Sequence, residues 1–135
     1  ARAIQKLQQG TVPIDAGGRE IGNNGNGSLM RILPGCLYLC DAPQEKACSD
    51  VDQLSCLTHA HPISRMSCVF YFLMCKNLIS EQIVRQAWKT TIDEFQGYFE
   101  RHPFRSELNN FEFICSKHFP DSSESEIASD GYVLN

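Results

Sequence analysis

The stretch from Gly22 to Pro34 holds residues whose types and spacing could bind a ligand. Three glycines within its first six positions precede an apolar run of helical length. Glycine allows positive φ and lets a ligand approach the main chain closely, and amide groups at a helix start attract anions. Ser28 stands where a helix N-cap is expected, ahead of Leu29 and Met30. The stretch indicates a loop that holds a phosphate or a sugar. A simple turn is the alternative, because Asn-Gly steps are strong turn formers.

A second stretch places Thr58, His59 and His61 just before Pro62. Proline fits the first position of a helix, so these side chains should crowd a helix start. An imidazole there can hydrogen-bond an anionic or hydroxyl-rich ligand, whereas a histidine that only caps or packs is the alternative. Cys56 with His59 and His61 could also ligate zinc, although the spacing lacks the paired pattern of structural zinc sites.

Composition restricts the class of protein. The 135 residues suit a single domain, 1–135, or part of a larger one, with 42% hydrophobic and 21% charged residues. A formal net charge of −4 argues against nucleic acid as a partner, and no apolar run reaches the ~18 residues of a membrane span. Seven cysteines without a Cys-x-x-Cys pair indicate buried free thiols. We therefore expect a cytoplasmic protein.

Apolar spacing predicts an all-α fold, because no segment alternates with period two. The clearest amphipathic pattern, Val84, Trp88, Ile92, Phe95 and Phe99, should face the core. Helices are expected over 1–9, 28–40 (bent or restarted at Pro34), 44–57, 62–78 and 80–99 (with Ser80 as N-cap), with loops at 10–27 and 121–126 and a looser apolar segment at 111–119.

The two stretches together resemble one family. Gly-Asn-Gly-Ser-Leu-Met-Arg-Ile-Leu-Pro at 25–34, followed by Leu-Thr-His-Ala-His-Pro at 57–62, is similar to motifs of the ADP-ribosylglycohydrolases, the relatives of dinitrogenase reductase-activating glycohydrolase. The segment Asp130–Leu134 also resembles the family's lead-in to its last helices. The resemblance implies a compact orthogonal helical bundle. Its activity would be removal of ADP-ribose from a modified side chain, or cleavage of related ADP-ribosyl compounds.

The resemblance also implies a site and a cofactor. ADP-ribose, free or on a modified protein, would contact Gly25, Asn26, Gly27, Ser28 and Met30, together with Thr58 and either His59 or His61. Two divalent ions, magnesium or manganese, would lie beside the distal ribose and orient its hydroxyls and a water. Arg31 could instead be structural, pairing within the helical core.

The family's metal-binding motifs are the point of departure. The sequence contains neither the upstream Thr-Asp-Asp motif nor the downstream Asp-x-Asp-Thr motif. Its Asp-x-Asp segment, Asp50-Val51-Asp52, lies between the two matched motifs, and we interpret it as a solvated helix face. We therefore expect the middle portion of a family domain, incomplete at both ends, without metal ligands and inactive alone. Its exposed apolar faces would favour self-association.

Two other interpretations stay open on the sequence. A non-catalytic relative could bind ADP-ribose without cleaving it, and acidic motifs on both sides of the chain would argue against that interpretation. A helical interaction domain unrelated to the family would have no affinity for ADP-ribose. In that case replacing Gly25 or Gly27 would change stability alone.

Overall fold

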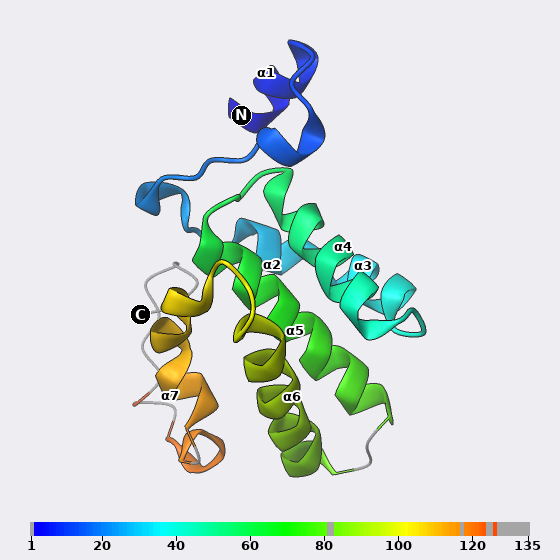
Figure 1. The fold of residues 1–135 in the computed structure, drawn as a ribbon, viewed down its shortest axis with the longest axis vertical. Helices are drawn as coiled ribbons and strands as arrows, with labels where there is room; N and C mark the ends of the chain where they lie inside the picture. Colours follow the sequence, from blue (N-terminus) through cyan, green and yellow to red (C-terminus); the bar gives the residue numbers. More distant parts are fainter. Residues whose placement is uncertain (1, 81–82, 117, 124–125, 127–135) are drawn as a thin grey trace.

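Helix α5 (Pro62–Ser80) runs through the middle of the structure, with the other long helices packed around it (Figure 1). The computed structural model describes residues 2–80, 83–116, 118–123 and 126. α4 (Gln44–Cys56) and α6 (Val84–Phe99) both pack along α5, and the short helices α2 (Gly27–Arg31) and α3 (Leu33–Leu39) contact it too. These residues form helices and turns without a strand, so the predicted all-α fold is confirmed.

The remaining elements are short. They are α1 (Arg2–Gln8), α7 (Glu112–Cys115) and the 3₁₀ turns η1 (Pro13–Asp15), η2 (Ile21–Asn23), η3 (Arg105–Phe111) and η4 (Phe119–Asp121). α1 projects from the body of the molecule in Figure 1 and has no buried residue. No described helix is long and apolar enough to cross a membrane.

The core forms where α5, α6 and η3 meet. The rings of Phe70, Phe99 and Phe111 surround Phe95, with centroids 5.0 to 5.2 Å from its own. Edge-to-face and tilted contacts of this kind stabilise aromatic clusters beyond simple burial. The predicted core face of α6 is confirmed at Ile92, Phe95 and Phe99, whereas Val84 is exposed because it is the first residue of the helix.

The predicted restart at Pro34 is confirmed, whereas two predicted N-caps are wrong. The segment 28–40 divides into α2 and α3 at Ile32, because Pro34 lacks the N–H that an unbroken helix needs. Ser28 is not the N-cap of α2, which begins at Gly27 after Asn26. Ser80 is not the N-cap of α6 either. It ends α5, where its hydroxyl donates to carbonyls of the preceding turn.

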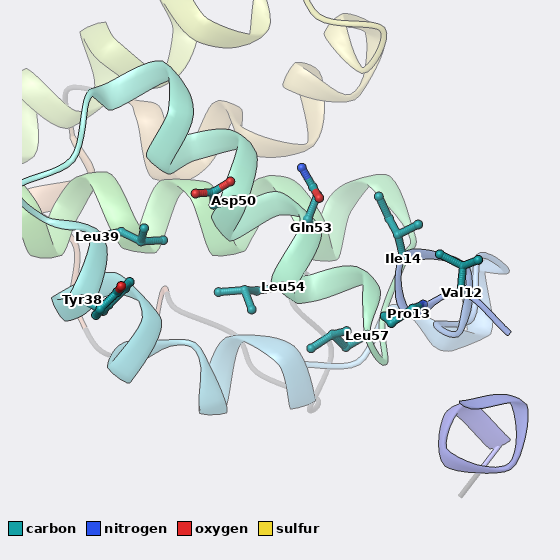
Figure 2. A pocket seen from close by; sticks show the side chains of 9 residues that line it. All are labelled: Val12, Pro13, Ile14, Tyr38, Leu39, Asp50, Gln53, Leu54 and Leu57. Carbon is teal, nitrogen blue, oxygen red and sulfur yellow. The ribbon is translucent and has the colours of Figure 1, made fainter. Parts of the chain in front are cut away.

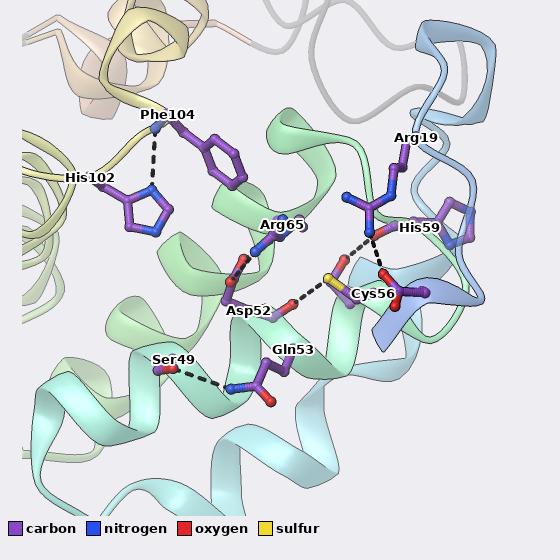
Figure 3. A network of polar contacts seen from close by, with 11 residues as sticks. Arg19, Ser49, Asp52, Gln53, Cys56, His59, Arg65, His102 and Phe104 are labelled. Atoms are coloured by element: carbon purple, nitrogen blue, oxygen red, sulfur yellow. Dashed lines mark hydrogen bonds and ion pairs between the residues drawn. The ribbon is translucent and has the colours of Figure 1, made fainter. Parts of the chain in front are cut away.

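The prediction of a solvated face at Asp50-Val51-Asp52 is wrong for its last two residues. Val51 is fully buried, and Asp52 is only 6% exposed. The Asp52 carboxylate accepts two hydrogen bonds from Arg65, from Nε at 2.7 Å and from Nη2 at 2.5 Å (Figure 3). Arg65 in turn lies over the ring of Phe104, 4.6 Å from its centroid. The pair ties α4 to α5, since a buried carboxylate needs a partner.

The looser apolar segment predicted at 111–119 contains the end of η3, all of α7 and the start of η4. The acidic loop predicted at 121–126 is described at 121–123 and 126, and Asp130–Leu134 lies outside the described residues.

Candidate functional site

A glycine pair brings the first loop against the turn that precedes α5. The Gly17 N–H donates to the Cys56 carbonyl (2.8 Å), the Gly18 N–H donates to the Thr58 carbonyl (3.2 Å), and the Gly18 carbonyl accepts from the Ala60 N–H (2.8 Å). A Cβ on Gly17 would lie 2.3 Å from the Cys56 oxygen. Only glycine permits this approach, because a side chain there would require the backbone to move.

A buried asparagine anchors the same loop on α5. Asn24 is 5% exposed, and its Oδ1 accepts a hydrogen bond of 2.8 Å from the hydroxyl of Ser64. Both groups are buried, so each satisfies the other. Neither residue was singled out from the sequence. The available signal was an asparagine within the glycine-rich stretch, which is also typical of an ordinary turn.

The two predicted motifs meet at Gly27 and His59. A Cβ on Gly27 would lie 2.7 Å from Cε1 and 3.1 Å from Nε2 of His59, and a Cβ on Gly25 would lie 3.8 Å from the same Nε2. The imidazole edge therefore faces the backbone of the glycine loop without side chains between them. The absence of a Cβ at Gly27 is what makes room for the ring.

Arg31 and Thr58 hold the opposite edge of that imidazole. Arg31 Nη2 donates to the Thr58 hydroxyl and to the Leu54 carbonyl, both at 2.9 Å. The Thr58 hydroxyl lies 2.8 Å from His59 Nδ1. The structural role considered for Arg31 is thus confirmed, although its partners lie at the end of α4 and the following turn. With Nδ1 engaged, Nε2 is the nitrogen that remains for a ligand.

Burial and the nearby Arg31 guanidinium lower the pKa of His59 below its ordinary value of 6.5. Desolvation disfavours the charged ring, and a neighbouring cation disfavours it further. His59 is therefore neutral at neutral pH. In that state its Nε2 can donate or accept one hydrogen bond according to the tautomer.

The remaining predicted site residues have separate positions. His61 Nδ1 accepts from the Ile63 N–H (3.3 Å), so His61 caps α5. The Asn26 carbonyl accepts from the Met30 N–H (2.9 Å) in the first turn of α2. The Met30 side chain is 78% exposed, whereas Ser28 is fully buried and its hydroxyl has no hydrogen-bond partner among the described residues.

A cleft of about 760 Å³ opens beside Thr58 and His59. This volume is within the range of small-molecule and cofactor sites. One wall is the loop from Ala16 to Glu20 with Asn23, and the other is α1, which contributes Arg2, Ala3, Ile4 and Lys6. Sequence reasoning found Thr58 and His59 but missed the first loop and α1, which carry no motif.

A second cleft, of about 560 Å³, lies between η1 and helices α3 and α4 (Figure 2). Most of its lining is apolar: Val12, Pro13, Ile14, Tyr38, Leu39, Leu54 and Leu57, with Asp50 and Gln53 at its edge. Tyr38 is 87% exposed. Contiguous exposed apolar surface of this kind is typical of interaction sites.

The described residues do not fit a metal centre. Within them, no three or more His, Cys, Asp or Glu side chains are grouped to hold an ion. Cys56, considered with His59 and His61 as zinc ligands, is buried, and burial raises the pKa of its thiol. Its Sγ lies 3.5 Å from the Asp52 carbonyl as a hydrogen-bond donor. A protonated thiol is a poor metal ligand.

The fold and site define a helical protein with a cleft lined by Gly17, Gly18, Thr58 and His59. The family model of the ADP-ribosylglycohydrolases matches residues 1–135, and the chain belongs to that family. Comparison with curated proteins and with solved structures found no match. Membership excludes the interpretation as a helical domain unrelated to the family.

Proposed function

We propose that the cleft beside His59 binds an ADP-ribosyl group, and that the chain takes part in cleaving the glycosidic bond between ADP-ribose and a modified side chain or a related ADP-ribosyl compound. The family match supports the class of substrate. The observation that carries the proposal is the approach of Gly27 to His59, because it brings the first family motif against the histidine of the second, and His59 lines the cleft.

The contacts suggest a role for each residue. Gly25 and Gly27 leave room for the His59 ring beside the loop, since a Cβ on Gly27 would lie 2.7 Å from its Cε1. His59 offers Nε2 to a ribose hydroxyl, while Thr58 and Arg31 keep the ring in place. Cleavage passes through a cationic, oxocarbenium-like state, and a neutral imidazole adds no opposing charge beside it.

The family is generally metal-dependent. Since the described side chains do not form a metal centre, we derive no catalytic step through an ion. The alternative form of this proposal, raised by the sequence, is a protein that binds ADP-ribose without cleaving it. The two forms differ in the flanking sequence, because cleavage requires the family's acidic motifs on both sides of this chain and binding alone does not.

The proposal is tested by calorimetric titration of the chain with ADP-ribose, with and without magnesium. Gly27→Ala should weaken binding by about tenfold or more, because the added methyl displaces the His59 ring. Gly22→Ala is the matched control, since nothing lies within 4 Å of a Cβ at that position. Absence of binding, or equal binding by both variants, would overturn the site assignment.

We also propose a cytoplasmic location, supported by the seven free cysteines, and self-association through the apolar cleft of Figure 2. A strongly acidic partner surface such as nucleic acid does not suit a chain with a net charge of −4.

A further inference from the structure

The charge distribution around the His59 cleft differs from that of the whole chain. The chain has a net charge of −4, yet the cleft lining contains Arg2, Lys6 and Arg19 against one carboxylate, Glu20. Arg19 is engaged with Asp15 at 2.7 Å. Arg2 and Lys6 form no ion pair with any residue that the structure describes. With Arg19 paired to Asp15, the lining keeps two cations, Arg2 and Lys6, against the single carboxylate of Glu20, so positive charge is in excess.

Both cations belong to α1, where they are four positions apart and so share one face of the helix. That spacing places them about 6 Å apart along the helix axis. They line the cleft from one wall, opposite the loop of Gly17 and Gly18 and beside Thr58 and His59. A ligand with adjacent phosphate groups could contact both cations from within the cleft.

α1 itself is held to the protein by few contacts. It has seven residues and none of them is buried. At its end the N–H groups of Gly10 and Thr11 return to the carbonyls of Leu7 and Lys6, and Gly10 has φ +84°. Because none of its residues is buried, α1 would gain order from any ligand that its side chains bind.

We propose that α1 is a cationic arm over the cleft, and that Arg2 and Lys6 bind the phosphate groups of the ligand. Charge-assisted hydrogen bonds from guanidinium and ammonium to phosphate are the contacts that these two side chains can make. The inference rests on the proposed function for the identity of the ligand as an ADP-ribosyl group. It adds phosphate-binding residues outside the two motifs, on a helix that has no buried residue.

The test compares ligands that differ in phosphate content. The 135-residue chain is titrated calorimetrically with ADP-ribose, with inorganic pyrophosphate and with adenosine, which has no phosphate. The variant is Arg2→Gln/Lys6→Gln. Its matched control, Lys89→Gln/Arg101→Gln, removes the same charge from two exposed side chains that do not line the cleft.

We expect the α1 variant to bind ADP-ribose about tenfold more weakly than the control, and pyrophosphate more weakly too. Adenosine binding should be unchanged. Hydrogen exchange gives an independent readout: ADP-ribose should protect the amides of α1 in the unmodified chain and in the control, but not in the α1 variant.

The outcomes separate this inference from the proposed function. If the α1 variant and the control bind ADP-ribose and pyrophosphate with equal affinity, the arm alone is overturned. The arm alone is also overturned if the α1 variant loses as much affinity for adenosine as for the phosphate compounds. Pyrophosphate binding that depends on Arg2 and Lys6, without an effect of Gly27→Ala on ADP-ribose, supports the arm and overturns the proposed site. Binding of neither phosphate compound overturns both.

Discussion

The backbone of Gly27 lies so close to the His59 ring that a methyl group on Gly27 would stand 2.7 Å from Cε1. Real Cβ atoms do not approach other atoms this closely, so the ring would have to move. The ring is fixed on its other edge by Thr58, 2.8 Å from Nδ1. The position of the His59 ring therefore depends on glycine at 27.

Gly27→Ala should displace the His59 imidazole and break its contact with Thr58. Alanine normally stabilises a helical position relative to glycine, yet here we expect a net loss of about 1 kcal/mol, because a hydrogen bond is lost. NMR of the His59 ring and denaturant unfolding measure the two effects. Gly22→Ala should leave the ring resonances in place, and a Gly27→Ala variant with unshifted resonances would contradict the coupling.

Arg31→Gln should raise the pKa of His59, since burial lowers that pKa first and the Arg31 charge lowers it further. In the unmodified protein, folded His59 therefore binds a proton less readily than His59 of the unfolded chain does. Above pH 6.5 both states are neutral and His59 contributes nothing to pH dependence. As pH falls from 6.5 through the folded pKa, the unfolded chain binds the proton first and stability decreases. An NMR titration of the ring checks both statements, with Arg85→Gln as the control.

Removal of one partner of the Asp52–Arg65 pair should strongly lower the free energy of unfolding. Their side chains are 9% and 17% exposed, so Asp52→Ala leaves a guanidinium without its carboxylate in a mostly buried place. We expect a loss of about 2–4 kcal/mol in urea unfolding. Asp52→Leu/Arg65→Met should recover part of this loss, because no charge then remains buried. A double variant less stable than either single variant would contradict this account.

The buried Cys36 and Cys48 and the half-buried Cys115 should be unreactive at neutral pH in the folded protein. Burial raises the pKa of Cys36 and of Cys48 to about 12, and that of Cys115 to about 11. The thiolate is the reactive form, so these three should be modified by a thiol reagent only after unfolding. Mass spectrometry of chain treated before and after denaturation measures this. Labelling of Cys48 in the native chain at neutral pH would show that the core opens locally.

The apolar cleft of Figure 2 should make the chain associate. Tyr38→Glu places a charge at a residue that lines this cleft and is 87% exposed. We expect sedimentation to show weaker, concentration-dependent association for this variant. Gln96→Glu adds the same charge on exposed α6 surface outside that cleft and should have no such effect. A chain that remains monomeric at high concentration would contradict self-association.

Periodic features of the sequence predicted most of the helical fold. The expected helix over 62–78 buries Ile63, Met66, Phe70 and Leu73, because side chains three and four positions apart share one face of a helix. Pro62 begins α5 for a similarly local reason, since its missing N–H is not needed there. Local rules failed at Ser28, which lies inside α2, and at Ser80, which ends α5.

By itself, the sequence determined the all-α class, the family and the two motifs, Gly25–Gly27 and Thr58–His61. Only the tertiary structure decided that His59 rather than His61 faces the glycine loop and that Asp52 is buried with Arg65. Only the structure also showed that α1 closes one wall of the cleft. The physical reason is range: caps and periodicity act within a few residues, whereas these contacts join residues that only the packed chain brings together.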